Sequence, residues 1–198
     1  YRLLSNDGVV WELNPSTPVL ESSSSGWDSH SVETPAVVFF QERYHLFYTG
    51  YDVPYDYATT GDDGTAGTSD DDVAAKHFRI GHAVSDDGID FTRVGVVAEP
   101  TAPYDDPNLD FKQMIVGEPA PVVFNDEIYL YFTAVGAAGE VDTSWQTLGL
   151  VTYDGESWDT PRRVLTPDLH LYPRNPYVGY STPNAVLIDG VMHLYYDV

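Results

Sequence analysis

Two glutamates stand just upstream of a proline and a hydrophobic run, at equivalent places in two repeated stretches. Glu33 lies two residues before Pro35, and Glu118 lies one residue before Pro119. If the two stretches meet at a common centre, their carboxyl groups can work as a pair, in which one protonates a leaving oxygen and the other activates water or attacks. This is the chemistry that cleaves a glycosidic bond. We therefore predict Glu118 and Glu33 as a pair of catalytic carboxylates.

The segments that lead into these stretches supply further candidates. Asp52 is a third candidate catalytic carboxylate. Four more residues are candidates for substrate binding, the aromatic ones because their rings can stack on sugars: Trp27, Asp28, Tyr51 and Tyr104. The alternative for each carboxylate is a solvated surface group, because the chain has 31 acidic residues. The alternative for each aromatic side chain is structural packing.

No cofactor is expected. The chain has no cysteine, and its six histidines show no spacing typical of metal ligands. Acidic clusters at 62–63 and 70–72 resemble a cation-binding loop only loosely, because the glycine and glutamate of an EF-hand are missing. A structural Ca²⁺ is thus an open alternative without support, and a solvated acidic loop is the simpler interpretation of residues 51–76.

The elements that would position the glutamates repeat three times, in residues 33–50, 117–134 and 181–198. Each repeat has a proline, an aliphatic run, a polar turn and an aromatic-rich run. This order predicts a β-hairpin. A second kind of hairpin is marked by Asp-Gly pairs at 7–8, 87–88 and 154–155, each followed by an aromatic residue, and Asp-Gly is typical of a type I′ turn.

Together the two hairpins form a unit of four antiparallel strands, which is the pattern of a β-propeller blade. The sequence therefore predicts an all-β fold with an outer hairpin at 1–20, full blades at 33–97 and 118–165, and an inner hairpin at 181–198. That makes about three blade equivalents, whereas closed propellers have roughly four to eight. Either the chain is part of a longer propeller, or two chains form a homodimer that completes the ring.

The charge excludes some partners. The formal net charge of −22 offers no basic patch for nucleic acid and disfavours anionic membrane surfaces. Strong self-repulsion is best tolerated in salt, so we expect an extracellular or periplasmic protein, from a saline environment. No apolar run suggests a membrane-spanning segment.

Two motifs carry a resemblance to a known superfamily. The stretch GEPAPVVFNDEIYLYFTA at 117–134 and the stretch RIGHAVSDDGIDF at 79–91 are similar to blades of the five-bladed propeller glycosidases, which include arabinanases, β-xylosidases, invertase-like fructosidases and mannoside phosphorylases. The resemblance implies that Glu118 is the general acid and that the substrate is an oligo- or polysaccharide. The Asn-Asp-Pro or Ala-Asp-Pro motif that carries the catalytic Asp of such enzymes does not open a blade here.

Two function classes remain open. The leading hypothesis is a glycoside hydrolase of furanosidase or xylosidase type, active in polysaccharide degradation. The alternative is a non-catalytic partial propeller that binds sugars or assembles with a second copy.

Overall fold

The computed structural model describes residues 1–60, 64, 72–101, 111–112, 115–137, 144–165 and 179–198. The fold is all-β, as predicted, with 58% of the described residues in strands. Among the described residues, no helix is long and apolar enough to cross a membrane. Tyr104 and the acidic residues 62–63 and 70–71 lie outside the described residues.

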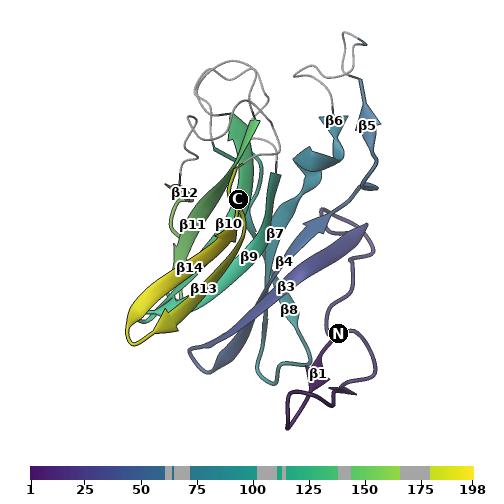
Figure 1. The fold of residues 1–198 in the computed structure, drawn as a ribbon. Coiled ribbons are helices and arrows are strands. Elements are labelled where there is room, and N and C mark those ends of the chain that lie inside the picture. Colours follow the sequence, from purple (N-terminus) through teal and green to yellow (C-terminus); the bar gives the residue numbers. More distant parts are fainter. Residues whose placement is uncertain (61–63, 65–71, 102–110, 113–114, 138–143, 166–178) are drawn as a thin grey trace.

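Two four-stranded antiparallel sheets form the body of the molecule (Figure 1). The first sheet has the order β3 (Ser31–Phe40), β4 (Arg43–Tyr51), β7 (Arg79–Ser85), β8 (Thr92–Ala98). The second sheet has the order β9 (Ile115–Phe124), β10 (Glu127–Ala137), β11 (Ser144–Tyr153), β12 (Arg162–Leu165). In both, chain order equals spatial order, so each sheet is two hairpins joined edge to edge.

Three smaller elements flank the two sheets. The C-terminal hairpin consists of β13 (Ser181–Ile188) and β14 (Val191–Asp197), and the N-terminal hairpin of β1 (Leu3–Leu4) and β2 (Glu12–Leu13). Between β4 and β7, a third hairpin of β5 (Ala58–Thr59) and β6 (Asp72–Val73) is followed by a 3₁₀ turn, Ala74–His77. Part of the segment predicted as an irregular loop is therefore ordered.

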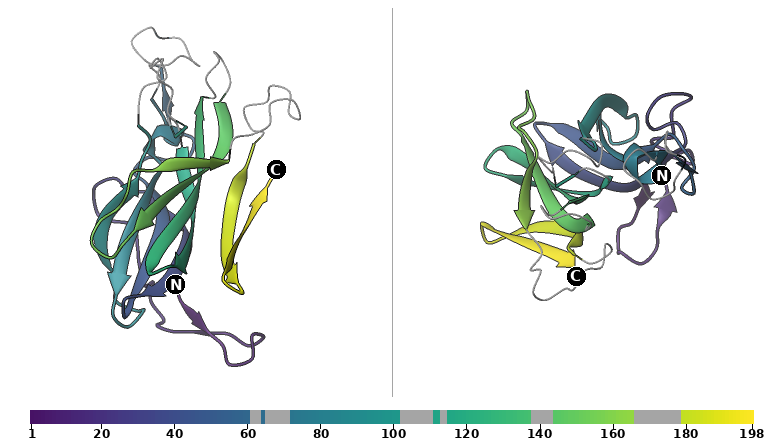
Figure 2. Two further views of the ribbon diagram at one scale, coloured as in Figure 1. Left: turned by 90° about the vertical axis from the view of Figure 1, so that its left-hand side faces the viewer. Right: turned by 90° about the horizontal axis from the view of Figure 1, so that it is seen from above.

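The sheets stack face to face and fan out, as the view from above shows (Figure 2). Phe47 and Ile80 of the first sheet form one buried cluster with Leu130 and Phe132 of the second. The opposite face of the second sheet, with Tyr131, packs against the C-terminal hairpin. The proline-led strands are innermost, because β9 contacts both β3 and β13. This arrangement is an incomplete β-propeller, and it confirms the predicted fold class.

The inner hairpins, β3–β4, β9–β10 and β13–β14, all have the same short turn. Two residues join the strands in each case, and both have positive φ, as a type I′ turn requires. The pairs are Gln41 (46°) and Glu42 (62°), Asn125 (51°) and Asp126 (60°), and Asp189 (51°) and Gly190 (76°). The matched twist of this turn type keeps the long inner strands paired along their length.

The Asp-Gly turns of the outer hairpins differ from the prediction. Only their glycines have positive φ, so the turns are not of type I′. The aspartate instead folds the chain with its side chain: one oxygen of Asp87 accepts the amides of Ile89 (2.8 Å) and Asp90 (3.0 Å). These hydrogen bonds stabilise the charged form and hold the pKa of Asp87 below its usual value. An Asx-type turn thus replaces the expected one.

Candidate functional site

Each inner strand carries a bulge next to its proline. The bulged residues Thr34, Glu118 and Thr182 all have positive φ, at 48°, 53° and 51°. The cross-strand pairs just before them are Glu33↔Thr49, Gly117↔Thr133 and Ser181↔Asp197. Glu118 is therefore equivalent to Thr34, and Glu33 is equivalent to Gly117. The predicted equivalence of the two glutamates is wrong by one residue, which is the difference in their distances from Pro35 and Pro119.

Hydrogen bonds at these bulges link one sheet to the next. The hydroxyl of Thr133 donates to Glu118 Oε2 (2.6 Å), which also accepts the amide of Thr182 (3.0 Å). On the other side, the Glu118 amide donates to Thr49 Oγ1 (3.0 Å), and that hydroxyl lies 2.6 Å from Thr34 Oγ1. Glu118 is thus fixed at its backbone by the first sheet and at its carboxylate by the second sheet and the C-terminal hairpin.

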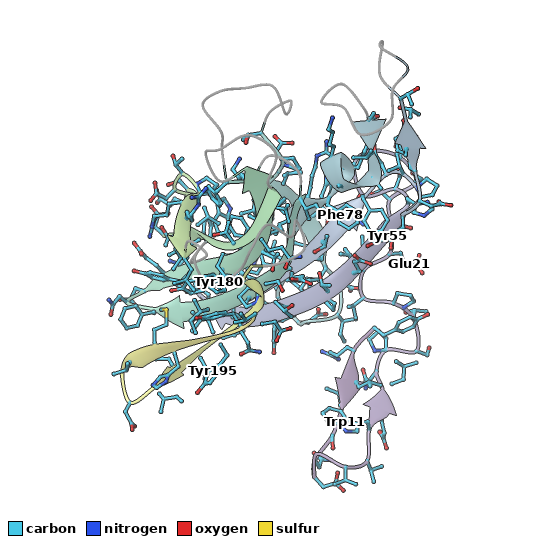
Figure 3. All side chains as sticks on the ribbon, turned by 45° about the horizontal axis from the view of Figure 1, so that its top comes forward. Trp11, Glu21, Tyr55, Phe78, Tyr180 and Tyr195 are labelled. Atoms are coloured by element: carbon cyan, nitrogen blue, oxygen red, sulfur yellow. The ribbon has the colours of Figure 1, made fainter. Side chains whose placement is uncertain are left out.

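A cleft of about 560 Å³ opens where these bulges meet. Both Glu33 and Glu118 line it, so the structure brings the two predicted carboxylates to one cavity from different sheets. Aromatic side chains from the segment between β4 and β7 also line the cleft, among them Tyr55, Tyr57 and Phe78. Figure 3 shows Tyr55 and Phe78 beside each other at this end of the first sheet. The volume is typical of a pocket for a small ligand.

Glu33 accepts a hydrogen bond from Tyr51. The Tyr51 hydroxyl donates to Glu33 Oε2 at 3.4 Å, while the Tyr51 ring is buried and stacks on Phe78 with ring centroids 4.5 Å apart. Tyr51 was predicted to contact substrate. Its ring is only 7% exposed, so the geometry gives it a supporting position under the cleft wall.

Asp52 has a different partner. His77 Nδ1 lies 2.7 Å from Asp52 Oδ1, and His77 Nε2 lies 3.0 Å from Asp72 Oδ1. The imidazole therefore bridges two carboxylates and ties the end of β4 to β6. A catalytic role for Asp52 stays a prediction that this geometry does not favour. No group of three or more His, Asp or Glu side chains in the described part of the chain is arranged to hold a metal ion.

Asp28 is buried away from the cleft. It is 2% exposed and accepts hydrogen bonds from Arg93 Nε (2.7 Å) and the Tyr48 hydroxyl (3.0 Å). Burial raises the pKa of Asp28, but hydrogen bonds from Ser23, Arg93 and Tyr48 outweigh this effect and hold the pKa below its usual value. The carboxylate therefore anchors the segment before β3 to β8.

Trp27 packs on the same face of the first sheet. Its ring stacks on Tyr48 with centroids 5.6 Å apart and planes at 17°. The indole fits because the strands beneath it carry glycines: a Cβ on Gly50 or on Gly81 would come within 2.6 Å of the ring. The structure thus gives Trp27 and Asp28 packing roles, and their contact with a substrate stays a prediction.

Sequence reasoning missed the threonines that hold Glu118. The spacing between the bulged residue and its threonine is the same in both sheets, since 49 − 34 = 15 and 133 − 118 = 15. A regular polar position on the second strand of each repeat was therefore visible in the sequence. The role of this position could not be predicted from the sequence, because each threonine hydroxyl also accepts a hydrogen bond from the next element, from the Glu118 amide at Thr49 and from the Thr182 amide at Thr133.

Comparisons with known structures support the fold. A family 117 glycoside hydrolase from the marine bacterium Zobellia galactanivorans gives a TM-score of 0.57 at 18% identity, over 83% of this chain and 47% of that chain. A structure from the family 130 mannoside phosphorylases, which contain glycoside hydrolases that target β-1,2 mannosidic linkages in Candida mannan, gives 0.56 at 15%, over 93% and 52%. The family 32 β-fructofuranosidase of Bombyx mori gives 0.51 at 17%, over 89% and 31%.

These likenesses show a shared propeller fold, as the resemblance in the sequence implied. The chain spans about half the length of the first two proteins and about a third of the last. The sequence matches no protein-family profile and, at a significant level, none of the curated proteins.

Proposed function

We propose that this protein acts on the glycosidic bonds of an oligo- or polysaccharide, with Glu118 as general acid and Glu33 as the partner carboxylate. One observation carries the proposal: two glutamates from different sheets line a single cleft of suitable size. Glycosidases use such a pair, one group protonating the leaving oxygen and the other activating water or forming the covalent intermediate. The shared fold with glycoside hydrolases is consistent with it.

The surroundings of Glu118 suit a positioned acid. Within the described residues, the hydrogen bonds to its carboxylate, from Thr133 and Thr182, go to Oε2. They fix the orientation of the carboxyl group and leave Oε1 as the oxygen to carry a proton to the substrate. Fixed orientation of this kind lowers the entropic cost of reaching the transition state.

The aromatic wall suits a sugar. Tyr55 is 77% exposed at the rim of the cleft, and its ring stands edge-on to Phe78 with centroids 6.1 Å apart. A sugar that stacks on Tyr55 would bury the ring face that is now in solvent. We propose this residue as the substrate platform, in place of the buried Tyr51.

Hydrolysis of arabinan, xylan, fructan and mannan by the wild-type chain and by the Glu118→Gln variant tests the proposal. We expect the variant to lose about 100-fold or more in rate on whichever substrate is cleaved, since general acid catalysis contributes that much. Glu42→Gln is the matched control, because Glu42 is exposed in the β3–β4 turn. If Glu118→Gln cleaves as fast as the wild type, the assignment of the acid is wrong.

A second candidate function is sugar binding without catalysis. It is favoured by Thr34, which holds the place of Glu118 in the first sheet and bonds to the same kind of threonine without a carboxylate. The bulged position can therefore have a purely structural role, in which its side chain only joins neighbouring strands. Calorimetric titration separates the two functions: oligosaccharide binding that survives Glu118→Gln, together with no hydrolysis by the wild type, would favour the binding module.

A further inference from the structure

Part of the cleft is lined by the chain between β4 and β7, of which the structure describes residues 52–60, 64 and 72–78. We call this part the aromatic segment, because Tyr55, Tyr57 and Phe78 from it line the cleft. Its two short strands, β5 and β6, pair with each other as a separate two-stranded sheet beyond the end of the first sheet (Figure 1). Contacts other than the hydrogen bonds of a larger sheet therefore set its place beside the cleft.

The aromatic segment makes a small apolar contact with the rest of the described structure. Tyr57 packs against a cluster formed by Tyr51, Ala74 and Phe78. Tyr55 is 77% exposed and meets Phe78 edge-on. Because little apolar area is buried here, polar contacts contribute a large share of the free energy that keeps the segment in place.

His77 supplies these polar contacts through both of its ring nitrogens. Nδ1 lies 2.7 Å from Asp52 Oδ1, directly after β4, and Nε2 lies 3.0 Å from Asp72 Oδ1 on β6. The other oxygen of Asp72 accepts the hydroxyl of Tyr57 at 3.1 Å, and the Tyr57 ring stands edge-on to the imidazole with centroids 5.5 Å apart. We call Asp52, His77 and Asp72 the clasp. It connects the end of the first sheet to an aromatic ring of the cleft.

The clasp is complete only when the imidazole is charged. An ionised carboxylate oxygen accepts hydrogen bonds and cannot donate them, so each ring nitrogen of His77 has to donate. A neutral imidazole has a single N–H and can serve one of the two aspartates, whereas an imidazolium has two and serves both. Loss of one proton from His77 therefore breaks one end of the clasp.

The groups around His77 come from each element that packs against it. They include Asp52 after β4, Asp72 on β6, the apolar Ile115 from β9, Lys76 and Arg79 on the same stretch as His77, and Glu99, which pairs with Arg79 at 3.3 Å. Arg79 also donates to the main-chain carbonyl of His77 at 2.9 Å and does not occupy the two carboxylates of the clasp.

We propose that His77 is a positioning residue of the cleft and that its charge controls how firmly the aromatic segment is held there. At acidic pH the imidazolium joins Asp52 to Asp72 and keeps Tyr57 and its neighbour Tyr55 beside the cleft. As the pH rises and the imidazole loses its charge, the segment opens more often and the cleft binds its ligand more weakly. The consequence for a sugar rests on the proposed function, whereas the clasp itself does not.

The size of the effect follows from the exposure of the clasp. The side chain of His77 is 19% exposed, and those of Asp52 and Asp72 are 36% and 47% exposed. Solvent screens ion pairs at such positions, and we therefore expect the loss of one end to raise the population of the open segment by about threefold to fivefold.

Amide hydrogen exchange of the full chain, followed by NMR, measures this opening without any ligand. The amide of Ala74 is the reporter, because it donates to the carbonyl of Tyr57 at 2.9 Å and is released when the segment opens. After correction for the intrinsic exchange rate, we expect its protection to be about threefold to fivefold higher at about pH 5.5 than at about pH 8, the range in which histidine side chains change charge. Amides of β4 that bond within the first sheet should not show this gain.

Two variants test whether His77 causes the difference. His77→Gln should have the low protection at both pH values, and Asp72→Asn should reduce the difference because one acceptor of the clasp loses its charge. His193→Gln is the matched control, since its ring stacks with Tyr195 on the C-terminal hairpin, and it should keep the behaviour of the wild type. Protection of Ala74 in the wild type that does not fall between the two pH values, or a fall that persists in His77→Gln, would overturn the clasp.

Steady-state kinetics on arabinan, xylan, fructan and mannan connect the clasp to the cleft. On whichever substrate is cleaved, the KM of the wild type should rise by about threefold to fivefold between the lower and the higher pH, whereas His77→Gln should have the raised KM at both. The change in KM should exceed the change in kcat that His77→Gln causes at the lower pH, because Glu118 is intact. A KM of the wild type without this rise would overturn the positioning role. Absence of hydrolysis would overturn the proposed function instead and leave the clasp to be judged by the exchange of Ala74.

Discussion

Replacement of His82 by leucine should remove an acid-sensitive element from the interface between the two sheets. His82 is 1% exposed and lies between the rings of His45 and Phe47, with centroids 5.1 and 4.9 Å away. Its Nε2 is 3.0 Å from His45 Nδ1, and its Nδ1 has no hydrogen-bond partner among the described residues. Leucine is the residue that the second sheet has at this register, as Leu150.

The magnitude follows from the shift of the pKa. Burial, and then the nearby positive charges of His45 and Arg43, lower the pKa of His82 from 6.5 to about 3. Unfolded chains therefore bind a proton below about pH 6.5 that the folded chain does not bind, so stability is lost as the pH falls towards 3. At about 1.4 kcal/mol per pH unit, His82 alone should lower the free energy of unfolding by roughly 2 kcal/mol between about pH 6.5 and about pH 4.5.

His45 acts in the same direction, because burial also lowers its pKa. His82→Leu should leave the free energy of unfolding at neutral pH within about 1 kcal/mol of the wild type, since it removes a buried polar atom together with one hydrogen bond. His82→Leu should have a higher free energy of unfolding than the wild type only at acidic pH.

Urea unfolding followed by tryptophan fluorescence, at several pH values between neutral and about pH 4.5, measures this difference. The control is His30→Leu, since His30 is exposed and its ring only leans against Tyr51 at 5.8 Å. We expect the control to keep the acid dependence of the wild type. If His82→Leu loses stability with falling pH as steeply as the wild type does, the buried imidazole is not the acid-sensitive group.

Two further predictions concern the hydrogen bonds that join the sheets. Thr133→Val breaks the bond to Glu118 and should lower the free energy of unfolding by about 1–3 kcal/mol in urea titrations, whereas Thr133→Ser should retain most of it. Asp28→Asn leaves Arg93 without its buried partner and should cost about 2 kcal/mol in the same assay, whereas Asp86→Asn, at an exposed ion pair, should cost less than about 1 kcal/mol. Equal costs at the two aspartates would contradict the structural role of Asp28.

The sequence alone predicted the hairpins and their order because these depend on neighbouring residues. A proline, an aliphatic run and a polar turn such as Asn125-Asp126 favour one local geometry wherever they occur. Repetition of that pattern then predicted stacked sheets with inner strands side by side, and β3, β9 and β13 have that arrangement. The Asp-Gly turns were placed correctly, although the backbone type was wrong, because their aspartate acts through its side chain.

The tertiary structure decided what the individual carboxylates do. Glu33 and Glu118 both stand shortly before a proline in the sequence, but pairing with β4 and β10 places Glu33 just before the bulge of its strand and Glu118 at the bulge of its own. Nothing in the sequence near Asp28 indicates that it is buried, because its ion-pair partner, Arg93, lies 65 residues away. Turns and strand patterns depend on adjacent residues, whereas burial, ion pairs and strand register depend on contacts between residues far apart in the sequence. Only the folded chain therefore distinguishes the carboxylates that line the cleft from those that hold segments together.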